Sequence, residues 1–221
     1  GILTEWPEGE YLELDTPLGA TAEWTGPEDL SAVMMFGYDS KNLYFAASVK
    51  DDTQTQNHAG WEIWQGDSIQ IGLDPLNRAR PMGYGPNMHE IGVTLIDGEP
   101  VCWRWEGRRG QPRNRMRQVD LVIKRDDALG LTLYEAAIPL ADLTPLLPEV
   151  FGRAGFALVL NDADTQDREH YMEPDPGVLT AGKHPERFRT LLFERRNRAQ
   201  EPVVRKTWAA LTWHETVLQP G

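Results

Sequence analysis

The feature that most constrains the fold is a series of short segments in which polar and apolar residues alternate, each ended by turn-forming residues. A period of two is typical of β-strands with one buried face. The expected strands lie near residues 11–14, 32–38, 43–50, 68–74, 90–95, 100–105, 118–125, 130–139, 155–162 and 190–194. Turn chemistry at 39–42, 97–98 and 126–130 predicts hairpins between successive strands.

Helical patterns are weak by comparison. No segment of ten or more residues has a convincing helical period, and 140–147 predicts one short turn among prolines. About ten strands with regular hairpin breaks predict an all-β fold, an antiparallel, jelly-roll-like β-sandwich over residues 1–194. The segment 195–221 changes character, with Trp208 and Trp213 after a polar, basic start, and is predicted to be a C-terminal extension or linker.

Charge and apolar patterning exclude several partners. The 22 Lys and Arg against 34 Asp and Glu give a formal charge of −12, which repels nucleic acid. The apolar runs are too short to span a bilayer, so no membrane partner is expected. Cys102 is the only cysteine, so no internal disulfide forms, and we expect a buried small apolar side chain there.

The loop between the strands expected at 43–50 and 68–74 combines aromatic and polar groups. Trp61 and Trp64 lie in this loop, and Gln70 follows it. Indole faces stack on the C–H faces of sugar rings, and a Gln amide both donates and accepts hydrogen bonds. The loop therefore predicts a site for a polar, ring-shaped ligand. The alternative is that the indoles plug the end of the sandwich and that Gln70 is an exposed strand residue.

Carboxylates cluster at two predicted strand ends. Asp51 and Asp52 end one strand, and Asn161, Asp162 and Asp164 end another. Calcium takes six to eight oxygen ligands, so neighbouring strand ends would be able to share one structural ion. Solvated turn carboxylates are the alternative.

Motifs for catalysis are absent from the sequence. It has no nucleophile elbow, phosphate loop or zinc spacing, so we expect a protein that is not an enzyme. Met88-His89 and the later 170–172 segment leave one alternative, a haem-binding relative, because His and Met ligate haem iron.

Several segments together resemble the family-nine carbohydrate-binding modules. These are the opening 1–6, the strand at 43–49 with Asp51, the segment 64–68 that leads into a strand ending at Asp74, the 155–162 strand, and 185–188 followed by Thr190-Leu191. The resemblance implies a β-sandwich with bound calcium and a sugar site at one end, where two tryptophans sandwich a terminal sugar. Trp64 corresponds to one of them. The second is missing, because 181–184 reads Ala-Gly-Lys-His, and Gly92 stands where such modules carry a basic residue.

The resemblance thus implies a non-catalytic module that binds an oligo- or polysaccharide, outside the cell or at its surface, in a protein that degrades glycans through a fused or neighbouring catalytic domain. The expected ligand residues are Trp64, Gln70 and Trp61, with Tyr84, Tyr171 or His184 as a substitute second face. Asp51 and Asp162 are the expected calcium ligands. Arg108, Arg109 and Arg113 form a basic rim if the glycan is acidic. A structural module that has lost its ligand is the remaining alternative.

Overall fold

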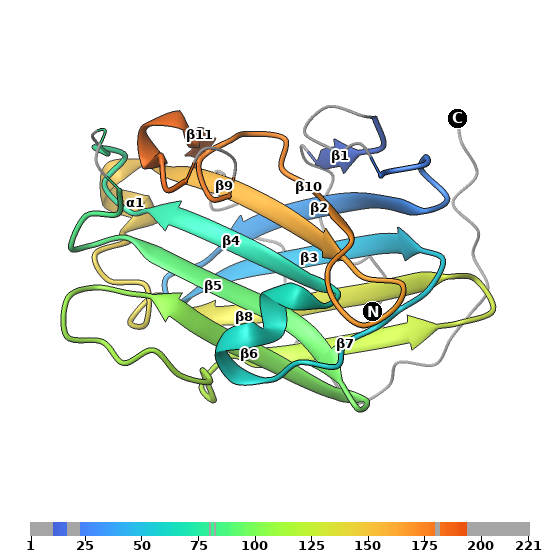
Figure 1. Ribbon diagram of the computed structural model, residues 1–221. Coiled ribbons are helices and arrows are strands. Elements are labelled where there is room, and N and C mark those ends of the chain that lie inside the picture. The colour runs from blue at the N-terminus through green and yellow to red at the C-terminus, as the bar shows by residue number, and fades with distance from the viewer. Residues whose placement is uncertain (1–10, 17–22, 80, 82, 180–181, 194–221) are drawn as a thin grey trace, which may run out of the picture.

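Two antiparallel sheets stack face to face in the computed structural model, which describes residues 11–16, 23–79, 81, 83–179 and 182–193 (Figure 1). The five-stranded sheet has the order β1-β2-β3-β8-β7. Its strands are β1 (Leu12–Leu14), β2 (Leu30–Tyr38), β3 (Asn42–Asp51), β8 (Leu131–Pro139) and β7 (Asp120–Asp126). The predicted antiparallel β-sandwich is therefore confirmed.

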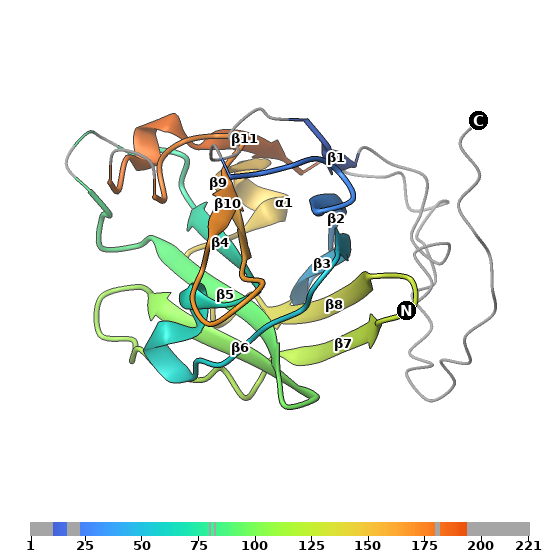
Figure 2. The same cartoon turned by 45° about the vertical axis from the view of Figure 1, so that its right-hand side comes forward.

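The second sheet has the order β10-β9-β4-β5-β6, and β11 also pairs with β9. Its strands are β10 (His170–Met172), β9 (Arg153–Asp162), β4 (Ser68–Asp74), β5 (His89–Ile96), β6 (Glu99–Glu106) and β11 (Arg189–Leu192). The view in Figure 2 separates this six-stranded sheet from the five-stranded one. The apolar residues between the layers, among them Met34, Phe45, Ile71 and Leu158, form one continuous core.

All three predicted hairpins occur. The 39–42 turn joins β2 to β3, and 126–130 joins β7 to β8. Between β5 and β6, Asp97 and Gly98 both have positive φ, 50° and 79°, as a two-residue hairpin turn of this kind requires. The turn residues that punctuate the sequence thus place the strand ends correctly.

Short elements account for the differences from the sequence prediction. The 3₁₀ helices η2 (Gly60–Gln65) and η3 (Pro185–Arg187) and the single-turn α1 (Pro148–Phe151) were not predicted, nor was β10. Elements of three to six residues do not establish a period. Helix α1 begins directly after the expected turn at 140–147. Pro148 sits at its first position, where the missing N–H of proline removes no intrahelical hydrogen bond.

The predicted domain limit at residue 194 lies at the edge of the described residues. The extension 195–221 and the opening segment 1–6 both lie outside them, so those interpretations stay predictions. None of the helices within the described ranges has the length and apolar character needed to cross a membrane.

Candidate functional site

The predicted ligand residues gather on the outer face of the six-stranded sheet, the face turned away from the core. Along β4, Ile69 and Ile71 enter the core, so Ser68, Gln70 and Gly72 face outward. All seven residues of β4 are nevertheless buried, because side chains from the surrounding loops and strands cover the outer face as well. Gln70 is only 3% exposed, so the interpretation of this residue as an exposed strand position is wrong.

Two glycines let aromatic rings lie against this face. A Cβ atom at Gly92 would be 2.3 Å from Cη2 of Trp105, and one at Gly72 would be 2.7 Å from Cζ of Phe188. The indole of Trp105 therefore fills the space at the position where related modules are expected to carry a basic residue. Any side chain larger than that of glycine at position 92 would require the Trp105 ring to move.

A continuous row of polar contacts crosses the outer face from β5 to β9. Nζ of Lys183 lies 2.6 Å from Oε2 of Glu90, and Nε2 of Gln70 donates to Oε1 of Glu90 at 3.3 Å. Nδ2 of Asn161 donates to Oε1 of Gln70 at 3.0 Å. Nη1 of Arg168 donates to Oδ1 of Asn161 at 2.9 Å. We call these five residues the outer-face row.

Arg168 ends the row between two aromatic rings. Its guanidinium carbon lies 4.8 Å from the ring centroid of Trp64 and 4.9 Å from that of Tyr171. Both distances are within the range of cation–π attraction. Burial lowers the pKa of Arg168 from its usual value. Trp64 is half-buried, with the guanidinium over its ring.

Trp61 lies in the same short helix as Trp64 but in a different environment. It is 49% exposed, and the guanidinium of Arg113 lies 5.3 Å from its ring centroid. Arg113 is also paired with the carboxylate of Glu106. One member of the predicted basic rim is therefore already neutralised within the protein.

Tyr84 and His184 lie in different contacts. Tyr84 packs edge-on against Phe188 at 6.0 Å between centroids, and Nζ of Lys183 lies 5.2 Å from the Tyr84 ring centroid. His184 pairs locally with Glu186, Nδ1 to Oε1 at 2.9 Å. Of the three candidates for a second aromatic face, Tyr171 is the one whose ring shares a cation with Trp64.

The two predicted strand-end clusters do come together, although they belong to different sheets. Asp51 ends β3, Asp162 ends β9, and Asp67 immediately precedes β4. One carboxylate oxygen from each lies within 4.8 Å of the others. Two oxygens about 2.4 Å from one calcium ion are at most about 4.8 Å apart, so the spacing suits a shared ion. We call these three residues the acidic cluster.

Burial disfavours the state in which all three carboxylates of the acidic cluster are ionised. Burial, with repulsion from Asp51 and Asp164, raises the pKa of Asp162 to about 9. Burial raises the pKa of Asp51 to about 6, against the attraction of Arg125. The pKa of Asp67 is also raised well above its usual value, mainly by burial. A bound cation would remove this repulsion and favour the ionised forms.

Asp162 supplies an independent indication of a missing partner. It is 1% exposed, and neither of its carboxylate oxygens accepts a hydrogen bond from the described residues. Buried carboxylate oxygens without hydrogen bonds are unusual and call for an ion or a water. The donor set consists of carboxylate oxygens, the ligands that a hard cation such as calcium prefers.

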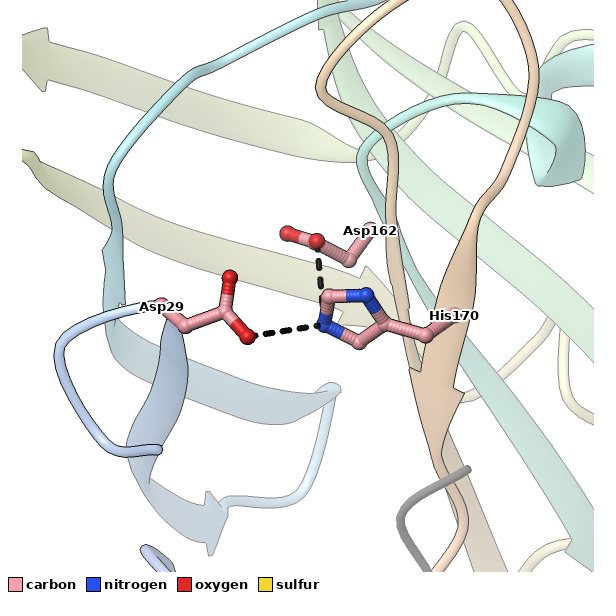
Figure 3. A group of neighbouring side chains, drawn as sticks. All are labelled: Asp29, Asp162 and His170. Atoms are coloured by element: carbon pink, nitrogen blue, oxygen red, sulfur yellow. Dashed lines mark ion pairs between the residues drawn. The ribbon is translucent and has the colours of Figure 1, made fainter. Parts of the chain in front are cut away.

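His170 of β10 lies beside the same carboxylate. Its Nε2 is 3.0 Å from Oδ2 of Asp162 and 3.7 Å from Oδ2 of Asp29 (Figure 3). The protonated imidazole would form an ion pair with both. This contact ties β10 and the segment before β2 to the end of β9.

The residues behind the haem alternative have other roles. Nε2 of His89 lies 3.0 Å from the carbonyl oxygen of Thr144, and burial lowers the pKa of His89 to about 4. The sulfur of Met88 accepts a hydrogen bond from the N–H of Gly85. These contacts give the haem alternative no support.

Comparison with known proteins identifies the family. Residues 4–176 match the family described as "Carbohydrate family 9 binding domain-like". The chain belongs to this family. No curated protein matches it.

Two solved family-nine modules from Caldicellulosiruptor kristjanssonii resemble this family-nine chain in fold. One, in complex with cellotriose, has a TM-score of 0.65 at 18% identity, covering 87% of this chain and 86% of its own. The other, in complex with glucose, has a TM-score of 0.63 at 20% identity, covering 84% and 86%. At these identities the likeness shows the common fold.

Sequence reasoning missed three residues of this family-nine chain's candidate site. Asp67 directly precedes β4, and its Oδ1 accepts the N–H of Ala163 at 2.8 Å. Its place beside Asp51 and Asp162 depends on which strands are neighbours. Asn161 and Arg168 had no pattern that marked their outer-face contacts, because Arg168 lies in an irregular loop.

Proposed function

We propose that this family-nine domain is a non-catalytic carbohydrate-binding module whose ligand stacks on Trp64. The observation that carries the proposal is that the rings of Trp64 and Tyr171 lie against the same guanidinium, that of Arg168, in a chain of this family. Aromatic faces beside a polar group suit a sugar ring, which offers apolar C–H faces and a polar edge. Cellotriose and glucose, the ligands of the two structural relatives, are the first neutral candidates.

The residues around the aromatic pair have separate roles in this proposal. Trp64 supplies the stacking face, and Tyr171 supplies the second face that the missing tryptophan leaves open. Gln70 holds Asn161, because its amide oxygen accepts from Nδ2 of that residue. A direct contact between Gln70 and a sugar hydroxyl stays a prediction, as do contacts from Trp61, Tyr84 and His184.

Replacing Trp64 tests the proposal. We expect Trp64→Ala to weaken glycan binding at least tenfold, since aromatic contacts contribute about 0.5–1.5 kcal/mol beyond the area they bury. Calorimetric titration with cellotriose, after a screen on a glycan array, measures the loss. Tyr11→Ala is the matched control, because Tyr11 is an aromatic residue 60% exposed in the segment that leads into β1 of the other sheet. Equal affinity of the Trp64→Ala variant and the wild type would refute the site.

We also propose that the acidic cluster binds a structural calcium ion. Asp51, Asp67 and Asp162 would hold it, and the ion would neutralise their charges and join β3 of one sheet to β9 of the other. The two oxygens of Asp162, which accept no hydrogen bond from the described residues, support this assignment. The ion has no catalytic part in the proposal.

A glycan-binding function also bears on where the domain acts. We propose that the domain acts outside the cell or at its surface, beside a fused or neighbouring catalytic domain that degrades the bound glycan. The sequence of the full-length gene product tests this. A full-length chain with no such domain, encoded away from any glycan-degrading enzyme, would contradict it.

A further inference from the structure

Arg168 and Lys183, the two cations of the outer-face row, have different partners. Lys183, at the other end, is 2.6 Å from the carboxylate of Glu90. Arg168 donates a hydrogen bond to the neutral amide of Asn161, and the buried carboxylate of Glu173 attracts it electrostatically. Its side chain is partly exposed to solvent. The protein thus holds a half-buried cation at its proposed ligand face, although its net charge is −12.

The position of the guanidinium matters as much as its charge. It lies over the rings of both Trp64 and Tyr171, where the proposed function requires a sugar to stack. A neutral sugar has to displace the guanidinium from at least one ring and replaces the cation–π attraction with a weaker contact. A sugar that carries a carboxylate instead gains a charged partner at the place where it stacks.

We propose, as a refinement of the proposed function, that Arg168 is a specificity-determining residue that selects uronic acid residues in the glycan. The guanidinium offers parallel N–H groups that match the two oxygens of a sugar carboxylate. The bond to Asn161 holds it in place, and Asn161 is itself fixed by its hydrogen bonds to Gln70 and Ser68, each 3.0 Å. The cation that selects the ligand is therefore pre-oriented, which lowers the cost of ordering it on binding.

A matched pair of ligands isolates this effect. Cellotriose and the β-1,4-linked glucuronate trimer differ at C6, where a carboxylate replaces the hydroxymethyl group. We expect the wild type to bind the glucuronate trimer at least tenfold more tightly in calorimetric titrations with calcium present. Arg168→Gln removes the charge and keeps a planar amide, and we expect it to lose about ten- to a hundredfold in affinity for the acidic trimer. Its affinity for cellotriose should rise a few-fold, because a neutral amide is displaced from the two rings more easily than a guanidinium.

Arg117→Gln is the control for net charge, because Arg117 is exposed between β6 and β7 and contacts neither ring. It should bind both trimers as the wild type does. A wild type that prefers cellotriose, or an Arg168→Gln variant that keeps the acidic preference, would overturn the role of Arg168. If Trp64→Ala abolishes binding in that case, the proposed function survives without the refinement. No binding of either trimer, or of any glycan on the array, would overturn the proposed function itself.

Discussion

Asn161 and Asp162 are consecutive residues of β9, but they belong to two different regions. The polar groups around Asn161 are hydrogen-bonded to one another, whereas the carboxylates around Asp162 are buried and repel one another. Asn161 points to the outer face and is hydrogen-bonded to Ser68, Gln70 and Arg168. Asp162 points between the sheets, and its oxygens have no hydrogen bond from the described residues. The paired strand β10 repeats the division, since Tyr171 lies opposite Asn161 and His170 opposite Asp162.

The two regions differ in whether their buried polar groups are satisfied within the protein. The outer-face row satisfies its own buried groups, so it holds its shape without an added partner. The acidic cluster concentrates buried carboxylates of raised pKa, so it gains most from an added cation. We therefore expect stability to depend on calcium at the cluster and on side-chain hydrogen bonds in the row.

Removal of calcium should have the largest effect. A ligand present at a thousand times its Kd stabilises the native state by about 4.1 kcal/mol. For a domain of this size that corresponds to roughly 8–16 °C in Tm. Calorimetric melting with EDTA and then with excess calcium measures the difference. The Asp162→Asn variant should melt at the same temperature in both buffers, whereas a calcium-insensitive wild type would contradict the assignment.

A pH titration of stability through His89 should have the next largest effect and involves neither region. Its pKa falls from 6.5 to about 4 on folding because the ring is buried. The unfolded chain therefore binds a proton where the native state resists it. The buried, neutral ring of His89 should make its full contribution to the free energy of unfolding above pH 6.5. That contribution should fall by about 3 kcal/mol as the pH falls to 4, at about 1.4 kcal/mol per pH unit.

Urea unfolding of the wild type and His89→Gln at several pH values isolates this contribution as the difference between two curves. Carboxylates that titrate in both proteins cancel. The variant should lose less stability than the wild type on acidification. Parallel curves would show that His89 is not buried in its neutral form.

Asn161→Ala should have an intermediate effect on the outer-face row. It removes the acceptor of Arg168 and the donor to Gln70 from a side chain that is 1% exposed. Leaving such groups unpaired costs about 1–3 kcal/mol. If the two regions are independent, chemical denaturation should give the same loss with calcium and with EDTA. A loss that appears only with calcium would show that the two regions are energetically coupled.

The fold was largely predictable because it rests on local rules. The alternation in β4 and the Asp97-Gly98 turn are patterns that neighbouring residues impose on each other. The three-residue β10 was not, because its pairing with β9 is determined by tertiary contacts. The acidic cluster lies between these cases. Asp51 and Asp162 were expected from their places at strand ends, and the fold alone adds Asp67.

The aromatic site was predictable only in part. Trp64 stood out because it lies in a polar loop between two strands. Its neighbours Arg168 and Tyr171 are more than a hundred residues away, and no local pattern relates a loop arginine to a distant ring. Gln70 was expected beside the tryptophan loop from its place in the sequence, but its burial depends on loops that cover the sheet.

Arg113→Gln should have the smallest effect, because Arg113 is the exposed counterpart of Arg168. Both arginines lie over a tryptophan of η2, at 5.3 Å for Arg113 and 4.8 Å for Arg168. The Arg113 side chain is 55% exposed and already has a carboxylate partner in Glu106. Exposed ion pairs contribute about 0–1 kcal/mol, so stability should change by less than that. Affinity for the glucuronate trimer should change less than twofold in calorimetric titration, because a neutralised cation in water adds little to an incoming carboxylate. A loss as large as that of Arg168→Gln would move the acidic-sugar site to the basic rim around Trp61.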